Sequence, residues 1–341
     1  MGMRSFSEED TMLIRKPVYF DKFHCIAASC PDSCCKEWAV QVDDTSAAYY
    51  RSLSGDLGDR LREVLREEDG ETVMTIEDGH CPMWRRDGLC RIQAELGESA
   101  LCNTCRAFPR LTHDYGDFVE FGLELSCPEA AKFILNNPPS PLLESGESDG
   151  EAEYDMEAMG VLLATREKML SILSDAVRPV PETLALALLY GYQAQGELDG
   201  GESLPFDENS ALEEAKRFAK PGSMEGILDF FLKLELLTHD WEERLRSPQN
   251  GAWEVRHLAL ARYLVERYWL QAVSDYDLYC RVKFIILSCL LVKHLGGDIL
   301  RTAQLFSKEI ENDVDNVETI LEGAYSHPAL RDDTLLGCLM E

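Results

Sequence analysis

The sequence predicts a mainly α fold, in which an N-terminal cysteine-rich metal-binding region with short strands and loops is followed by an irregular α-helical domain. Two observations lead to this prediction. Nine of the twelve cysteines lie between Cys25 and Cys127, in turn-rich sequence beside Pro, Gly, Asp and Ser. In the second half, apolar residues recur at the spacing of one helix face, without a repeat of fixed period. We therefore expect a cysteine-rich metal- or cluster-binding domain over 1–135, an acidic Pro/Gly linker over 136–154 and an α-helical domain over 155–341.

Length and charge narrow the functions open to the chain. Its 341 residues suggest about two domains. The net charge of −29 repels phosphate backbones and excludes nucleic acid as a partner, whereas a basic partner or a lysine-bearing surface would be attracted, unless the charge serves solubility alone. The longest apolar runs, Leu184–Leu189 and Ile285–Val292, are shorter than the roughly 20 residues of a membrane-spanning helix, so we expect no membrane insertion. Met1–Asp10 is polar and shows no secretory signal, so we expect a cytoplasmic protein.

Short elements are predicted around the cysteines. Extended runs predict strands at Pro17–Phe20, Ala39–Val42, Thr72–Ile76 and Phe118–Leu125. Ser46–Asp69 is rich in Arg, Leu and Glu and predicts one or two exposed helices. The spans next to the cysteines are expected to be loops held by metal rather than by an apolar core.

A break in composition separates these elements from the helical half. Asn136–Gly150 contains three prolines, two glycines and no basic residue, as expected of a linker. Gly296 and Gly297 should end one later helix, and Asp298 should cap the next. The apolar periodicity predicts helices over Met156–Ala176, Glu182–Gln195, Ala211–Ala219, Met224–Leu237, Trp253–Gln271, Tyr276–Leu295 and Asp298–Gly323. The cysteines of this half, expected to be buried small hydrophobes, are Cys280, Cys289 and Cys338.

The clustered cysteines predict metal ligation or redox chemistry, because a cytosolic chain does not normally keep structural disulfides. The candidate metal ligands are Cys25, Cys30, Cys34, Cys35, Cys81, Cys90, Cys102, Cys105 and Cys127. The two-residue gap between Cys102 and Cys105 lets one turn aim both sulfurs at a single metal. The adjacent Cys34 and Cys35 point differently, so one of them is expected to serve a second centre or to be no ligand. Four thiolates suit zinc and an iron–sulfur cluster alike, and the spacing leaves both open.

Other motifs are absent or secondary. Cys30-x3-Cys34 is followed by Glu37 at the position where the usual radical-SAM cluster motif has a cysteine. The chain contains no P-loop, no G-x-S-x-G and no G-x-G-x-x-G between a strand and a helix, so no catalytic or cofactor-binding residue is identified. Secondary ligand candidates, each directly before a cysteine, are His24 and His80. Residues expected to pack around the metal are Trp38, Trp84, Phe108 and Arg110.

The residues around these cysteines resemble the flagellin lysine-N-methylase family. The resemblance lies within about residues 20–135, in the runs CIAASCPDSCCKEWAVQVDDTSAAYY, CPMWRRDGLCRIQAELGESALCNTCRAFPR and FGLELSCPEAAKFIL. It includes all nine clustered cysteines, and it extends to a wider group of zinc- or iron-chelating cysteine-cluster domains. The resemblance implies methyl transfer to lysine side chains of flagellin, with S-adenosyl-L-methionine as donor and a 4Fe–4S cluster bound by these cysteines, Zn2+ being the alternative.

Three functions are therefore open. The first is an S-adenosylmethionine-dependent lysine N-methyltransferase acting on flagellin, which must remove a proton from the lysine ammonium before the nitrogen can attack. The second is a non-enzymatic zinc- or iron-binding interaction module. The third is a redox sensor that uses the cluster or exposed thiols.

Overall fold

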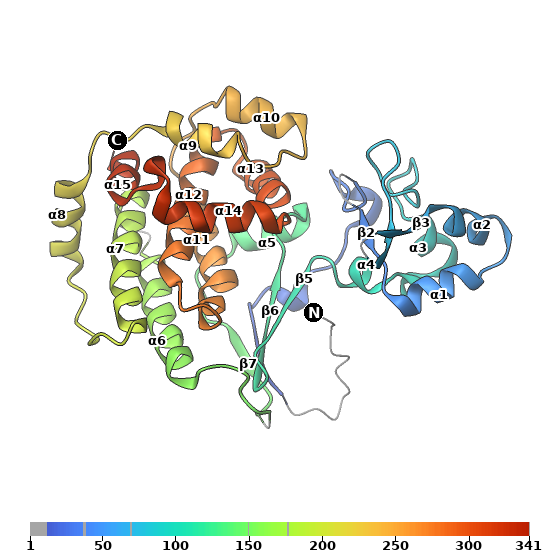
Figure 1. The fold of residues 1–341 in the computed structure, drawn as a ribbon, viewed down its shortest axis with the longest axis horizontal. Helices are drawn as coiled ribbons and strands as arrows, with labels where there is room; N and C mark the ends of the chain where they lie inside the picture. The colour runs from blue at the N-terminus through green and yellow to red at the C-terminus, as the bar shows by residue number, and fades with distance from the viewer. Residues whose placement is uncertain (1–11, 37–38, 69, 149, 176, 341) are drawn as a thin grey trace. The chain divides into compact units, whose positions relative to one another are not determined.

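The computed structural model describes residues 12–36, 39–68, 70–148, 150–175 and 177–340 (Figure 1). Within these residues, the chain forms two compact units that are not consecutive in sequence. One, which we call the cysteine unit, comprises residues 22–111 and 123–130. The other, the helical unit, comprises the described residues of 1–21, 112–122 and 131–341. The fold is mainly helical with small sheets, as the sequence predicts.

Short helices and a small sheet make up the cysteine unit. Its antiparallel sheet has the order β2-β4-β3, from Val40–Gln41, Glu71–Met74 and Leu65–Glu68. Its helical elements are η2 (Ala27–Ser29), α1 (Asp44–Ser52), α2 (Gly55–Val64), α3 (Arg91–Leu96), η3 (Glu98–Ala100) and α4 (Asn103–Ala107). The side chains of Tyr50, Leu61 and Met83 are buried in an apolar cluster. The unit thus has an apolar core of its own, contrary to the expectation of loops held by metal alone.

Asp43 joins two helices of this unit. One oxygen of its carboxylate caps α1 by accepting the N–H of Ser46 at 3.0 Å, and the other accepts the N–H of Asn103, the first residue of α4, at 2.9 Å. The Tyr50 hydroxyl on α1 donates to the carbonyl of Ala100 at 2.7 Å. These contacts fix the segment that contains Cys102 and Cys105 against α1.

In the cysteine-rich half, two segments differ from their predicted structure; in the helical half, Met224–Leu237 is an α-helix only to Phe231, and Asp298–Gly323 is divided into separate helices. Pro17–Phe20 is no strand but a turn, closed by a hydrogen bond from the N–H of Phe20 to the carbonyl of Pro17 at 3.0 Å. Ser46–Asp69 is helical only in its first part, because Leu65–Glu68 forms β3 and pairs with β4. The residues of β3 are good helix formers, but Asp-Gly at positions 69 and 70 favours a tight hairpin, and strand pairing overrides helix propensity.

A second sheet, with the order β5-β6-β1-β7, is formed by Arg110–Asp114, Phe118–Leu123, Leu13–Lys16 and Leu143–Ser145. Here β1 runs parallel to β6 and antiparallel to β7. The predicted linker is therefore not free chain, since it supplies β7. Sequence reasoning missed this strand because prolines and glycines surround it.

The helical unit contains the long helices. They are α6 (Met156–Ile172), α7 (Val180–Leu198), α8 (Glu208–Phe218), α9 (Met224–Phe231), α10 (His239–Arg246), α11 (Val255–Tyr268), α12 (Leu278–Leu295), α13 (Ile299–Phe306), α14 (Val314–Ser326) and α15 (Asp332–Met340). Shorter turns are η4 (Trp269–Val273), η5 (Ser307–Glu311) and η6 (Pro328–Leu330). The chain crosses from one unit to the other four times, within η1 (Phe20–Lys22), β5, β6 and α5 (Pro128–Asn136).

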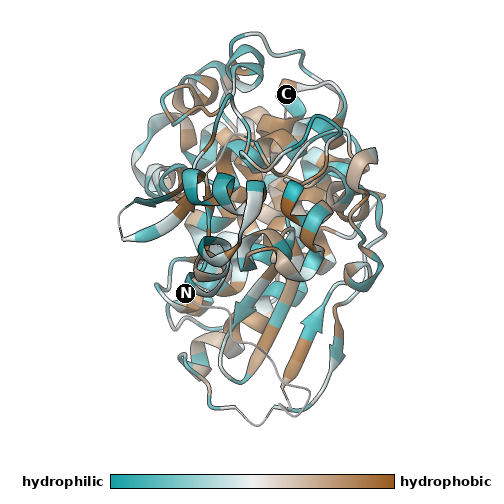
Figure 2. Cartoon of the chain, turned by 90° about the vertical axis from the view of Figure 1, so that its right-hand side faces the viewer, coloured by the Kyte–Doolittle hydropathy of each residue, from teal (hydrophilic) through white to brown (hydrophobic). Residues whose placement is uncertain are grey.

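Helix α12 is at the centre of this unit, because residues on every side of it are buried. It packs closely on α7, where a Cβ atom at Gly191 would lie only 2.4 Å from Val282 Cγ1. Hydrophobic residues gather in the interior of the packed helices (Figure 2). Among the described helices, none combines the length and the apolar content that crossing a bilayer requires.

A buried ion pair joins the second sheet to the helices. Glu120 of β6 and Arg166 of α6 are only 4% and 6% exposed, and both carboxylate oxygens accept a guanidinium N–H at 2.7 Å. Two parallel hydrogen bonds between charged groups are the strongest form of this contact. Removing one partner would leave the other charge buried without compensation.

We therefore expect Arg166→Met to lower the free energy of unfolding by about 3–5 kcal/mol, because the buried Glu120 carboxylate would lose its ion pair with Arg166. Urea denaturation followed by circular dichroism measures this loss. Glu120→Leu combined with Arg166→Met should recover much of it, since neither charge then remains. Arg246→Met, which breaks an exposed pair with Glu242, should cost less than about 1 kcal/mol. A double variant no more stable than Arg166→Met would contradict the assignment.

Candidate functional site

The cysteine unit contains every one of the nine clustered cysteines, whereas Cys280, Cys289 and Cys338 lie in the helical unit. The nine come from loops and helix starts. Cys90 and Cys102 precede α3 and α4 directly, and Cys105 lies within α4. Cys127 stands immediately before α5. Burial in α12 raises the pKa of Cys280 to about 12 and raises that of Cys289 still further, as expected of buried small hydrophobes, whereas Cys338 is only half-buried.

The sulfurs of the cluster influence one another's ionisation. Cys30 is affected by Cys25 and Cys34, and Cys127 by Cys30 and Cys34. Cys81 and Cys90 are each affected by Cys34 and Cys102, and Cys105 by Cys102, Cys35 and Cys81. The two sulfurs of Cys34 and Cys35 are 4.0 Å apart. The fold therefore brings all nine predicted ligands into one group of mutually interacting thiols.

Backbone amides face six of these sulfurs, from residues two or three positions further along the chain. The N–H of Ala27 donates to Cys25 Sγ at 3.4 Å. Amides placed in the same way act to lower the pKa of five further thiols. The N–H of Asp32 faces Cys30, that of Met83 faces Cys81, those of Ile92 and Gln93 face Cys90, that of Cys105 faces Cys102, and those of Glu129 and Ala130 face Cys127. N–H groups beside sulfur stabilise the thiolate, which is the form that binds a metal.

Burial opposes the amides at most of these thiols. It raises the pKa of Cys81 and of Cys127 to about 11, so both are protonated at neutral pH. Cys102 and Cys105 form a pair in which a hydrogen bond from the Cys105 thiol lowers the pKa of Cys102, while Cys102 raises the pKa of Cys105. One proton shared between two neighbouring sulfurs accounts for the opposite directions.

Two of the side chains expected to pack around the metal, Trp84 and Arg110, contact other side chains of the cysteine unit. The ring of His80 stacks on Trp84 with centroids 4.2 Å apart, and the Arg110 guanidinium lies 5.3 Å from the centre of the Phe23 ring. Trp38 lies outside the described residues. In the part of the chain that the structure describes, no group of three or more His, Cys, Asp or Glu side chains is arranged to hold a metal ion. The predicted metal centre is therefore not formed by the side chains as they stand, although their chemistry suits zinc or an iron–sulfur cluster.

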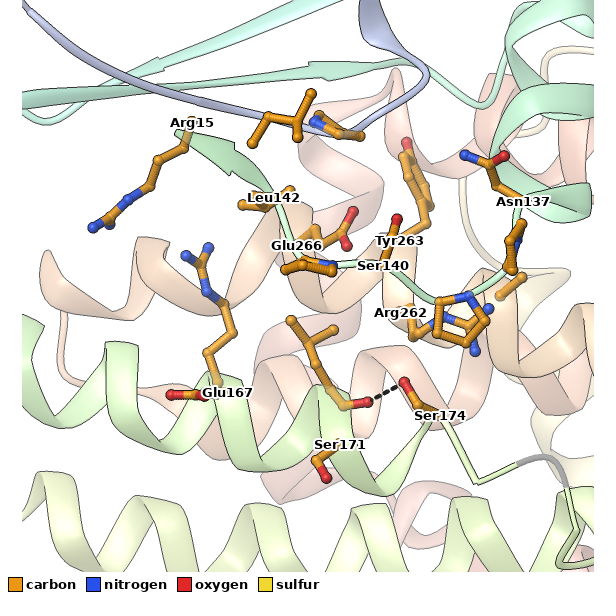
Figure 3. Close-up of a pocket in the computed structure, with 18 of the residues that line it drawn as sticks. Arg15, Asn137, Ser140, Leu142, Glu167, Ser171, Ser174, Arg262, Tyr263 and Glu266 are labelled. Atoms are coloured by element: carbon orange, nitrogen blue, oxygen red, sulfur yellow. Dashed lines mark hydrogen bonds between the residues drawn. The ribbon is translucent and has the colours of Figure 1, made fainter. Parts of the chain in front are cut away.

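Sequence reasoning did not identify a second site, a pocket in the helical unit (Figure 3). Its volume is about 940 Å³, and it is lined by α6, α11, β1, β7 and the proline-rich segment 137–142. Glu266 of α11 lies at this pocket and is half-buried. No described residue donates a hydrogen bond to its carboxyl. Burial raises the pKa of Glu266 to about 7, although Arg166 and Arg262 act in the opposite direction.

Curated relatives match part of the chain. The lysine-N-methylases of Salmonella typhimurium and Salmonella choleraesuis are 33% and 35% identical over 137 residues, which is 38% of this chain and 34% of each relative. The flagellar biosynthetic protein FliU of Salmonella muenchen is 34% identical over 143 residues, which is 40% of this chain and 84% of FliU. The chain thus matches about a third of the length of these lysine-N-methylases. No protein-family model and no solved structure matches the chain.

The raised pKa of Glu266 predicts a pH-dependent stability. The folded protein holds this proton up to about pH 7, while a carboxyl in the unfolded chain loses it near 4.5, so this group lowers the free energy of unfolding as pH rises through that window. Glu266→Gln should therefore be more stable than wild type at pH 8.5, by about 1–3 kcal/mol, and nearly equal to it at pH 4.5. Chemical denaturation at both pH values measures the difference. Glu214→Gln, which alters an exposed carboxylate of α8, is the control. An equal pH effect on the stability of both variants would contradict the raised pKa of Glu266.

Proposed function

The chain belongs to the family of FliU and the lysine-N-methylases, and from this premise we propose that it transfers methyl groups to lysine side chains of a flagellar protein, flagellin. The proposed donor is S-adenosyl-L-methionine. In this reaction the neutral lysine nitrogen attacks the methyl carbon of the sulfonium, the N–C bond forms as the C–S bond breaks, and S-adenosylhomocysteine leaves. Because lysine has a pKa near about 10.4, a protein base must first take up its proton.

We further propose that the cysteine unit binds an iron–sulfur cluster, with zinc as the alternative. The supporting observation is the gathering of nine thiols in one unit, with amides facing six of the sulfurs. The ligands would be drawn from Cys25, Cys30, Cys34, Cys35, Cys81, Cys90, Cys102, Cys105 and Cys127. Zinc bound there would hold the loops together, and an iron–sulfur cluster would also exchange electrons. We propose a cytoplasmic location, because thiols in such number stay reduced there.

The acidic composition favours the proposed substrate class. A net charge of −29 attracts a cationic, lysine-bearing surface at long range. This attraction is sequence-independent, so it supports encounter with the substrate and does not select one lysine. We expect the rate of methylation at low substrate concentration to fall as salt is raised.

A second candidate function follows from Cys102 and Cys105. Two thiols with two residues between them, one with a lowered pKa and the other with a raised pKa, are the arrangement of a redox-active dithiol. This favours the redox sensor over the interaction module as the alternative. Brief alkylation at pH 7, followed by peptide mapping, would modify Cys102 before Cys105 if the pair is free and would leave both unmodified if a metal binds them.

The metal proposal predicts the composition of the purified protein. Protein prepared anaerobically and without chelator should contain at least one transition metal per chain, as iron with acid-labile sulfide. Metal analysis and a visible spectrum measure both. Because binding displaces thiol protons, the affinity should rise with pH. Less than one metal per chain would contradict the proposal, and a colourless zinc-loaded protein would assign zinc instead.

The activity is tested with metal-loaded protein, flagellin from the same host and labelled donor, by reading lysine masses with and without a reductant. We expect a gain of methyl mass on lysine. A requirement for reductant would indicate a redox-active cluster, and methylation without reductant would indicate direct transfer beside a structural metal. Replacing Cys102 and Cys105 together by Ala should abolish the activity, while Cys338→Ala in the helical unit should keep it. No methylation in either condition would favour the alternatives.

A further inference from the structure

Two opposite charges face the pocket of the helical unit without pairing. Arg262 and Glu266 both line it and lie one turn apart on α11 (Figure 3). At this spacing Arg and Glu often form an ion pair, although the order with Arg first is the weaker one. Here Arg262 instead donates from Nη1 to the carbonyl of Leu173 at 2.9 Å, and no described residue forms an ion pair or hydrogen bond with the Glu266 carboxyl. The cavity therefore offers a guanidinium and a carboxyl group to a ligand, and a bound cation would favour the ionised form of the carboxyl.

The neighbouring arginines, Arg166 and Arg15, already bind carboxylates of the protein. Arg166 gives both of its Nη atoms to Glu120, and Arg15 binds Glu144 at 2.8 Å through Nε. Two further donors at the pocket remain unsatisfied, because Arg15 Nη1 and Asn137 Nδ2 are buried without a hydrogen-bond partner. Buried donors without partners are costly, so their presence at a cavity indicates that water or a ligand satisfies them.

The rest of the pocket is suited to an apolar body. Leu163 and Leu170 of α6 form one wall, and Pro138, Pro139 and Pro141 contribute another. Prolines hold this wall in shape, since their ring fixes the backbone. A volume of about 940 Å³ is at the upper end of the range for small-molecule sites and is far larger than a free amino acid needs.

We propose that this pocket binds an organic molecule that is larger than a free amino acid and carries an α-amino-acid head group. The ammonium of the head group would lie at Glu266 and its carboxylate at Arg262. An amine alone would leave Arg262 uncompensated beside it, and a carboxylic acid alone would be repelled by Glu266. A zwitterion satisfies both groups at once, and the apolar walls accept the remainder of the molecule. The choice of probe below rests on the proposed function, because S-adenosyl-L-methionine carries such a head group.

Isothermal titration calorimetry of the full chain tests the proposal with three related probes. S-adenosyl-L-methionine carries both charged groups of the head, its decarboxylated form lacks the carboxylate, and methylthioadenosine lacks both. We expect S-adenosyl-L-methionine to bind, and each of the other two to bind at least about tenfold more weakly, as the loss of a charged hydrogen bond implies. Equal affinities for all three would overturn the proposal.

Variants separate the assigned pair from general charge effects. Glu266→Gln and Arg262→Gln should each weaken binding of S-adenosyl-L-methionine at least about tenfold, and Arg262→Lys should weaken it less. Glu167→Gln removes an exposed carboxylate of the same pocket and should have little effect. Thermal unfolding of each variant shows whether it is folded. A loss in Glu167→Gln equal to that in Glu266→Gln would overturn the assignment.

The experiments distinguish a failure of the pocket proposal from a failure of the proposed function. If S-adenosyl-L-methionine does not bind, but millimolar L-methionine raises the melting temperature of wild type and not of Glu266→Gln, the head-group site stands and the proposed donor falls. If methyl transfer occurs and both pocket variants bind the donor as tightly as wild type, the function stands and the pocket assignment is overturned. If neither probe binds, the pocket proposal is wrong.

Discussion

The helical unit depends on the buried pair of Glu120 and Arg166. Each charge is tolerated away from water only because the other is held in a two-bond contact, so β6 and α6 must keep their relative position for either to remain buried. The pair also decides which charges the pocket presents. Since Glu120 occupies the Arg166 guanidinium, Arg262 and Glu266 of α11 are left without an ion-pair partner among the described residues.

The cysteine unit meets a different constraint. Its apolar core around Tyr50 and Leu61 buries several thiols, and burial keeps them protonated. The amides that face the sulfurs act against burial and favour the thiolate. A metal would complete this compensation, because its charge replaces the protons that the thiols lose. The unit is therefore folded by its apolar residues, and the proposed metal would act on the ionisation and position of its loops.

The two units offer unlike chemistry. Thiols in the cysteine unit are soft donors, suited to zinc or iron–sulfur chemistry. The pocket of the helical unit combines a carboxyl, a guanidinium and apolar walls, which suits a small charged organic molecule. In the proposed transferase, the pocket would bind the donor and a metal at the thiols would order the cysteine unit.

The sequence by itself determined the helical class, the strands at β2, β4 and β6, and the grouping of nine cysteines, because periodicity, extended runs and ligand spacing are local properties of the chain. Tertiary structure alone decided the strand β7, since Leu143–Ser145 pairs with a strand far away in sequence. It also decided the pocket. In sequence, Arg262 and Glu266 have the spacing of an ordinary exposed pair, and only the packing of α6, α11 and the proline-rich segment partly removes Glu266 from water and leaves it without an ion-pair partner among the described residues.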